Sequence, residues 1–257
     1  MKKRYLEVKA RFIAEKISQA KHFIALTGAG ISTESGIPDY RGDNGIYKSK
    51  AQGKEVKVKP LEEFEPNPAH YALVRLQDLG LLKFIISQNI DGLHIKSGIK
   101  ESLIAEIHGN YSILKCIECD SRFTKKEMNW DNEKYGWGAR SAEPSPEQPN
   151  CQNCGGRLIS SIVNFGEPMP EKEMKLAKEH SKKCDLMLVI GTSLRVAPAN
   201  TLPSIAEKNG AEVFIINLKP TGLDNILKNE RIKAKAGEIL PLIVNYIEEN
   251  IEKDSKT

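Results

Sequence analysis

Two Cys-x-x-Cys pairs constrain this chain more than any other feature of its sequence. The first pair is Cys116 and Cys119, the second is Cys151 and Cys154, and residues 120–150 separate them. Two such pairs are typical of a tetrahedral Zn²⁺ site made of four thiolates, which leaves no position open for water. This spacing disfavours the alternatives, disulfide bonds or redox-active thiols. We therefore expect a structural zinc ion in a small module and chemistry elsewhere in the chain.

Outside this module, apolar runs that end in glycine or polar residues alternate with stretches of helical periodicity. Strands are expected at residues 22–26, 84–86, 103–107, 186–190 and 213–216, and helices at 4–20, 68–80, 171–182, 199–208 and 237–251. This alternation predicts a Rossmann-like α/β fold, a parallel sheet with helices on both faces. The Gly-, Lys-, Glu- and Pro-rich segment 42–66 is expected to be a mobile loop.

The same pattern divides the chain into two domains. Residues 1–110 and 161–257 are expected to form the Rossmann-like domain. Residues 111–160 hold the paired cysteines, both tryptophans and a proline-rich stretch, and are expected to be an inserted zinc module.

Composition excludes several classes of protein. The net charge of +4 is mild, and the basic residues around the cysteines are offset by acidic ones, which disfavours a zinc ribbon that binds nucleic acid. No apolar run is long enough to span a bilayer, and no apolar segment follows the basic first residues. Together with the thiolate site, this predicts a cytoplasmic protein, or a nuclear one if the source is eukaryotic.

Polar residues or glycines follow five of the expected strands. They are Gly28-Ala29-Gly30, Gln88-Asn89, His108-Gly109, Gly191-Thr192-Ser193 and Asn217. Ligands of parallel sheets bind beyond the carboxyl ends of the strands, so we expect these residues to line one crevice. The turn at residues 28–32 resembles half of a dinucleotide-binding fingerprint, with Thr33 in place of the third glycine.

Motifs throughout the chain resemble the sirtuins, which are NAD-dependent protein-lysine deacylases. The motifs are Gly28-Ala29-Gly30-Ile31-Ser32, Ser35-Gly36-Ile37-Pro38-Asp39-Tyr40-Arg41, Gln88-Asn89-Ile90-Asp91, His108-Gly109, the cysteine pairs, Phe165-Gly166-Glu167 and Gly191-Thr192-Ser193. They occur in the order of the family and span roughly residues 20–240. Residues 91–94, 107–110 and 216–221 resemble the branch that includes nuclear, chromatin-acting sirtuins.

The resemblance implies a reaction and the residues that perform it. In the family, the carbonyl oxygen of acyl-lysine attacks the ribose carbon that carries nicotinamide, and a histidine then deprotonates a ribose hydroxyl. The products are lysine, nicotinamide and O-acyl-ADP-ribose. His108 matches that histidine, since an imidazole can act as a base near neutral pH. The other histidines, His22, His70, His94 and His180, are expected to be ordinary core or surface residues.

The resemblance also implies the contacts with NAD and peptide. Asn89 orients the ribose, and Asp91 binds the nicotinamide carboxamide or serves as a helix N-cap. The implied NAD contacts are Gly28, Ala29, Gly30, Ser32, Asp39, Tyr40, Arg41, Gln88, Ile90, Asp91, Gly191, Thr192, Ser193, Asn217, Leu218 and Ala236. The substrate peptide pairs as a strand with Val163, Asn164, Phe165, Gly166 and Glu167.

Two residues depart from the family pattern. Tyr40 stands where the family usually has Phe, which adds a hydroxyl group near the reacting ribose. Asn164 stands where many relatives have an apolar residue, and it changes the wall of the acyl tunnel or faces solvent. The short segment 43–66 resembles the nuclear-like branch, whose acyl pockets are often open, so we expect long acyl chains to be accepted.

Two other functions would use the same residues. A protein mono-ADP-ribosyltransferase shares the loss of nicotinamide, and a non-enzymatic NAD sensor shares the pocket but needs no base such as His108. The expected partner is an acyl-lysine protein or peptide, including chromatin proteins and others associated with nucleic acid. We expect no membrane partner and a monomeric protein.

Overall fold

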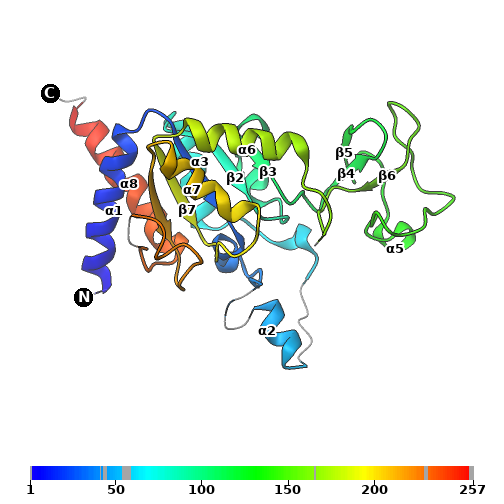
Figure 1. Ribbon diagram of the computed structural model, residues 1–257, viewed down its shortest axis with the longest axis horizontal. Coiled ribbons are helices and arrows are strands. Elements are labelled where there is room, and N and C mark those ends of the chain that lie inside the picture. Colours follow the sequence, from blue (N-terminus) through cyan, green and yellow to red (C-terminus); the bar gives the residue numbers. More distant parts are fainter. Residues whose placement is uncertain are drawn as a thin grey trace. The chain divides into compact units, whose positions relative to one another are not determined.

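The computed structural model describes residues 2–40, 42, 45–53, 59–164, 166–228 and 231–254 (Figure 1). The chain forms two compact units. The first comprises Met1–Gln88, Leu93–Ile107 and Glu171–Thr257, and the second comprises Asn89–Gly92 and His108–Pro170. Residues 111–160 lie inside the second unit, which extends beyond them on both sides. None of the helices in the described ranges is long and apolar enough to cross a membrane.

A five-stranded parallel sheet forms the centre of the first unit. Its strands are β1 (Phe23–Thr27), β2 (Leu82–Ser87), β3 (Ile104–Glu106), β7 (Leu186–Ile190) and β8 (Glu212–Ile216), in the order β3-β2-β1-β7-β8. Every pairing is parallel, so the carboxyl ends of all five strands lie at one edge of the sheet. The strand order reverses between β1 and β7, which is where sheets of this kind bind ligands. The predicted fold class is confirmed.

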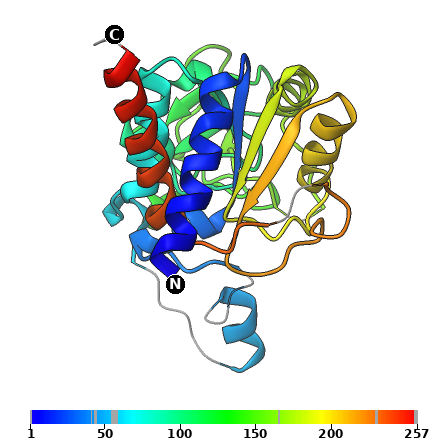
Figure 2. The same ribbon diagram turned by 90° about the vertical axis from the view of Figure 1, so that its left-hand side faces the viewer.

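Helices cover both faces of this sheet (Figures 1 and 2). On one face, α8 (Ala236–Asp254) contacts both α1 (Lys2–Gln19) and α3 (Pro68–Asp78). On the other face, α6 (Glu171–Lys183) contacts α7 (Leu202–Lys208).

In the described part of the first unit, two short helices were not predicted. The expectation of a loop throughout residues 42–66 is wrong over α2 (Ile46–Ala51) and over a 3₁₀ turn at Leu61–Glu63. α4 (Leu93–Ser97) follows the Asn89–Gly92 segment. Helices of five or six residues are too short to show the apolar periodicity from which a helix is predicted.

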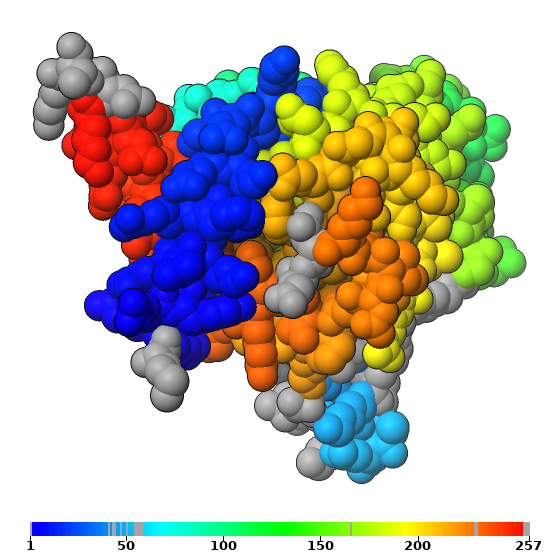
Figure 3. All heavy atoms as spheres, turned by 60° about the vertical axis from the view of Figure 1, so that its left-hand side comes forward, coloured from blue at the N-terminus to red at the C-terminus, as the bar shows by residue number. Residues whose placement is uncertain are grey.

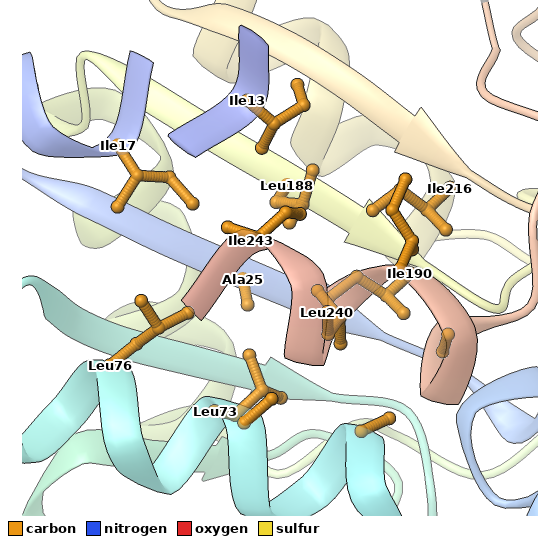
Figure 4. Packing of buried hydrophobic residues seen from close by; sticks show 14 of the residues in the cluster. Ile13, Ile17, Ala25, Leu73, Leu76, Leu188, Ile190, Ile216, Leu240 and Ile243 are labelled. Atoms are coloured by element: carbon orange, nitrogen blue, oxygen red, sulfur yellow. The ribbon is translucent and has the colours of Figure 1, made fainter. Parts of the chain in front are cut away.

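The core of the first unit lies between the sheet and the α1, α3 and α8 helices. Figure 4 shows how side chains from these three helices, such as Ile13, Leu73 and Ile243, meet Ala25 and Leu188 of the sheet. β1 and β7 are buried at every position, as expected for central strands covered on both faces. Each fully buried Leu or Ile contributes about 1.5–3 kcal/mol. The opposite face of α1 lies along the surface (Figure 3).

Two buried histidines lie next to the carboxyl end of β1. His94 hydrogen-bonds Thr27 Oγ1 through Nε2 at 2.8 Å, and the rings of His70 and His94 have centroids 5.1 Å apart. Burial lowers the pKa of His70 to about 4 and holds the pKa of His94 well below its ordinary value. Both are therefore neutral core residues at pH 7, as expected for these two histidines.

Asn67 connects the start of α3 to the turn that follows β1. Its Oδ1 accepts a hydrogen bond from Ala69 N at 2.9 Å, and its Nδ2 donates to Ile31 O at 2.7 Å and to Ser35 Oγ at 3.0 Å. His70 completes the cap, since its Nδ1 accepts from Asn67 N at 3.3 Å. One buried side chain thus caps a helix and holds the glycine-rich turn.

A three-stranded antiparallel sheet organises the second unit. Its strands are β4 (Ile113–Cys116), β5 (Arg122–Thr124) and β6 (Leu158–Ser160), in the order β5-β4-β6, and α5 (Asn132–Tyr135) lies in the same unit. Trp130 is buried in a small apolar core and donates Nε1–H to Gly136 O at 2.9 Å. Trp137 of the same module is instead 57% exposed beneath the Lys125 ammonium.

We expect the free energy of unfolding to fall as the pH drops from 6.5 through 4. His70 stays neutral in the fold down to a pKa of about 4. An unfolded histidine titrates near ~6.5, so the unfolded state binds more protons within that window. This histidine should account for a loss of about 2 kcal/mol between pH 7 and pH 5.

Chemical denaturation of the wild type and of His70→Asn at the two pH values measures this loss. Asparagine retains a side-chain acceptor but does not titrate, so the variant should lose less stability than the wild type on acidification. Equal losses in the two proteins would contradict the assignment.

Candidate functional site and metal centre

The turn after β1 lies directly against the turn after β7. Gly28 N donates to Ile190 O at 3.0 Å, and Gly30 N donates to Gly191 O at 2.7 Å. A Cβ at Gly30 would lie 2.7 Å from Gly191 Cα, and a Cβ at Gly191 would lie 2.4 Å from Ile31 N. Sequence analysis assigned Gly30 to the binding of NAD. The structure gives a further reason for a glycine here, because the turn after β7 lies too close for a side chain.

This edge of the first unit offers donors to an anion. Ala29 opens a 3₁₀ turn, Ala29–Ile31, and its N–H donates to no described residue. Beside it, Gln88 Nε2 donates to Thr27 O at 3.3 Å and to Thr192 Oγ1 at 3.2 Å. The structure therefore brings together the predicted 28–32 turn, Gln88 and the 191–193 turn, at the point where the strand order reverses. The Ala29 N–H and the polar side chains at this point suit a phosphate group.

The segment from the end of β8 to the start of α8 carries three residues predicted to contact NAD, which are Asn217, Leu218 and Ala236. Arg231 donates from Nη1 to Asn217 O at 2.9 Å, and its Nε lies 2.8 Å from Asp224 Oδ2. Leu218 is 48% exposed, and Ala236 is buried at the first position of α8. Sequence reasoning missed Arg231, because no motif surrounds this residue.

Asp39 closes the loop that leads into α2. Its Oδ1 accepts from Gly42 N at 2.7 Å, and its carbonyl oxygen accepts from Ile46 N at 2.9 Å. Tyr40 is 40% exposed. Arg41 lies outside the described residues.

In the second unit, the main chain at His108 is bonded to the start of the predicted peptide-binding segment. Val163 N donates to His108 O at 3.0 Å. Gly109 has φ +81°, and a Cβ there would lie 2.1 Å from Ser161 O. Ser161 Oγ donates to Asn110 O at 2.8 Å and accepts from Asn110 N at 3.0 Å. Residues 108–110 and 161–163 are thus closely packed, with the His108 side chain half-buried.

The segment that bears Asn89, Ile90 and Asp91 joins the same part of the second unit. Ile90 O accepts from Tyr111 N at 2.9 Å. The side chains of Asn89 and Asp91 are buried, each residue being 6% exposed. The second unit therefore brings the predicted ribose-binding and carboxamide-binding residues to the turn that follows His108.

A turn follows Val163. Glu167 N donates to Asn164 O at 3.1 Å, and the Glu167 carboxylate accepts from Asn164 N at 3.0 Å and from Asn164 Nδ2 at 3.3 Å. Asn164 and Gly166 are exposed, which favours the solvent-facing interpretation of Asn164. Phe165 lies outside the described residues.

The four predicted cysteine ligands come together. The Sγ atoms of Cys116, Cys119, Cys151 and Cys154 all lie within 4.8 Å of one another, with three pairs at 3.3–3.6 Å. A tetrahedral site with Zn–S bonds of about 2.3 Å has S···S edges of about 3.8 Å. The set therefore fits one zinc ion with four thiolate ligands and no water.

The two loops that present these cysteines share the same main-chain geometry. Asp120 N donates to Cys116 O at 3.2 Å, and Gly155 N donates to Cys151 O at 2.8 Å. Asp120 and Gly155, each four residues after a first cysteine, have φ +59° and +74°. This matched pair of tight loops brings the four sulfur atoms together.

We expect Cys151→Ser to lose zinc and to melt at a lower temperature than the wild type. A serine hydroxyl is a poor replacement for a thiolate, and metal binding is coupled to the folding of such modules. Metal analysis and thermal unfolding measure both effects. Cys184→Ser, which removes the buried thiol outside the set, should keep its zinc. A Cys151→Ser protein with full zinc content and unchanged melting temperature would refute the four-cysteine site.

The chain resembles characterised proteins over nearly its whole length. A sequence profile of the Sir2 family matches residues 28–58 and 51–198. The NAD-dependent protein deacylase 2 of Archaeoglobus fulgidus is 37% identical, over 94% of this chain and 97% of that protein. An NAD-dependent protein deacetylase of Thermodesulfovibrio yellowstonii is 38% identical, over 91% and 93%.

Solved structures agree with these sequence matches. A Sir2 variant with a deacetylated p53 peptide and 3′-O-acetyl ADP-ribose has a TM-score of 0.70 at 31% identity, over 91% of this chain and 96% of that one. Sir2Af2 bound to a myristoylated histone peptide has a TM-score of 0.67 at 33% identity, over 96% and 99%. Matches of this extent and identity, together with the cysteine site and the glycine turns, show that the chain belongs to the Sir2 family.

Proposed function

We propose that the protein is an NAD-dependent protein-lysine deacylase that converts acyl-lysine, NAD and water into lysine, nicotinamide and O-acyl-ADP-ribose. The observation that carries this proposal is the 3.0 Å hydrogen bond from Val163 N to His108 O. It holds a histidine and a peptide-binding segment together in one compact unit. The printed names of the relatives, deacylase and deacetylase, support this activity over ADP-ribosyl transfer to protein or NAD sensing.

His108 is the proposed base of the reaction. NAD supplies the ribose carbon that accepts the acyl oxygen. The His108 imidazole then takes a proton from a ribose hydroxyl, a step that typically contributes ~10²–10⁴-fold to the rate. Asn89 orients the ribose, and the Asp91 carboxylate accepts an N–H of the nicotinamide carboxamide. The burial of Asn89 and Asp91 supports these roles, because buried polar groups hold a ligand in a fixed orientation.

The strand ends of the first unit are proposed to bind the rest of NAD. The Ala29 amide faces no described partner and suits the pyrophosphate. The full proposed set is Gly28, Ala29, Gly30, Ser32, Asp39, Tyr40, Arg41, Gln88, Ile90, Asp91, Gly191, Thr192, Ser193, Asn217, Leu218 and Ala236. The packing of the 28–32 turn, Gln88 and Thr192 against one another supports this assignment.

The zinc ion is proposed to have a structural role. β4 begins shortly after His108, and β6 ends just before Ser161. The two strands pair directly, with Cys116 opposite Leu158. A metal that fixes these strands also fixes the spacing between the base and the peptide-binding segment, although it contacts neither. We propose residues 111–160 as the metal-bearing module and the flanking residues 1–110 and 161–257 as the nucleotide-binding domain.

The substrate is proposed to be an acyl-lysine peptide that pairs as a strand with residues 163–167. Structures of Sir2 proteins with p53 and myristoylated histone peptides support acylated proteins associated with chromatin, and support long acyl chains as well as acetyl. We propose that the protein acts as a monomer in a reducing compartment.

We expect His108→Ala to lower kcat/KM for deacylation by at least about a hundredfold, because the base is removed. Mass spectrometry of acetyl- and myristoyl-lysine peptides, with and without NAD, measures the loss of acyl mass and the formation of O-acyl-ADP-ribose. His180→Ala, on α6 of the first unit, should keep wild-type activity. Unchanged zinc content and melting temperature control for folding.

Three results would contradict the proposal in different ways. Near-normal turnover by His108→Ala would reject this base. ADP-ribose accumulating on the peptide or on the enzyme would indicate a transferase. NAD binding without any chemical change would indicate a sensor.

A further inference from the structure

A basic groove runs beside the segment proposed to bind the peptide. Its floor is the run of residues 159–163, which ends at the Val163 that bonds His108. Three cations line it, and they are Lys115, Arg122 and Arg140. Glu167, Pro168 and Pro170 line it as well. All of these residues belong to the second unit.

Two of the three cations face each other across neighbouring strands. Lys115 of β4 is the register partner of Arg122 of β5 and also of Ile159 of β6. Register partners lie on one face of a sheet, and like charges placed directly opposite each other destabilise it. Asp120 relieves part of this repulsion, since its Oδ1 lies 2.6 Å from Lys115 Nζ. The register therefore gathers two cationic side chains on one face of the small sheet.

The third cation lies in a loop that is held against β6. Ser160 N donates to Gly138 O at 2.7 Å, and Arg157 Nη2 donates to Ala139 O at 3.3 Å and also to Ala142 O. These bonds anchor the loop on both sides of Arg140. The guanidinium is therefore presented to the groove from an ordered main chain, which lowers the entropic cost of binding a ligand.

The groove carries an excess of positive charge. Glu167 is the single acid among its described lining residues. Both oxygens of this carboxylate already accept hydrogen bonds from Asn164, at 3.0 and 3.3 Å. The acid thus closes its own turn, and the three cations outnumber the carboxylates of Glu167 and Asp120 around the groove.

We propose that this groove binds an acidic side chain of the substrate, so that the enzyme prefers acyl-lysine flanked by Asp or Glu. The inference rests on the proposed deacylase function. Strand pairing through main-chain atoms supplies affinity without sequence preference, and preference must come from pockets for neighbouring side chains. A guanidinium fork matches a carboxylate in shape and charge. The groove adjoins the peptide segment, which favours a peptide carboxylate over nucleic acid as its ligand.

The test compares acetyl-lysine peptides that differ only at flanking positions, carrying Asp and Glu, or Asn and Gln. We expect the wild type to show a kcat/KM at least about fivefold higher for the acidic peptide, expressed mainly in KM. The ratio should decrease between 50 and 500 mM salt, because exposed charges are screened. In the double variant Arg122→Gln/Arg140→Gln the ratio should fall to about one.

Lys126→Gln is the matched control, since it removes one exposed positive charge from the same unit outside the groove. This variant should keep the wild-type ratio. If the double variant does not fold, Arg140→Gln alone, in the loop, should still reduce the ratio. Melting temperature and zinc content show whether the double variant is folded.

The outcomes separate this inference from the deacylase proposal. An active wild type with a ratio near one, or a ratio that the variants leave unchanged, overturns the groove as a specificity site. Oligonucleotide binding that the double variant loses, with equal kcat/KM for both peptides, also overturns it. If the wild type deacylates no peptide, the proposed deacylase function is rejected. The groove is then judged by fluorescence anisotropy of the labelled peptides, which must show tighter binding of the acidic one and loss of that difference in the double variant.

Discussion

The close approach of the turns after β1 and β7 is the contact on which the first unit depends. The two turns meet where the strand order reverses, and Gly30 N donates to Gly191 O at 2.7 Å. The two main chains lie so close that no side chain fits between them. Asn67 holds the first of these turns from the start of α3. The turn is therefore rigid before any ligand arrives, and a rigid set of main-chain donors loses little entropy on binding an anion.

The second unit is too small to be stabilised by an apolar core alone. Four thiolates around one metal replace much of that core, and the paired loops at Cys116 and Cys151 put the sulfur atoms at tetrahedral spacing. Cys116 is the last residue of β4, which pairs with β6, so the cysteine cluster adjoins the small sheet. β4 begins shortly after His108 and β6 ends shortly before Val163, so the metal centre and the candidate site residues are held by the same two strands.

Much of the fold and of the candidate site was predictable from local sequence. Glycine and polar residues after apolar runs marked the strand ends, and paired cysteines marked the metal site. Other features carried no local signal. α2 is too short and polar to show periodicity, Arg231 stands in no motif, and Trp137 is exposed although tryptophan is usually packed.

The sequence by itself determined the α/β class and the four clustered cysteines, and it named the candidate site residues, because periodicity, spacing and motif are local properties. The tertiary structure decided which of these residues meet. It showed that Gly30 is required by Gly191, and that His108 O is bonded to Val163 N at the start of the predicted peptide-binding segment. It also placed Lys115 opposite Arg122 beside that segment. Strand register and the packing of turns are long-range properties, and no short stretch of sequence encodes them.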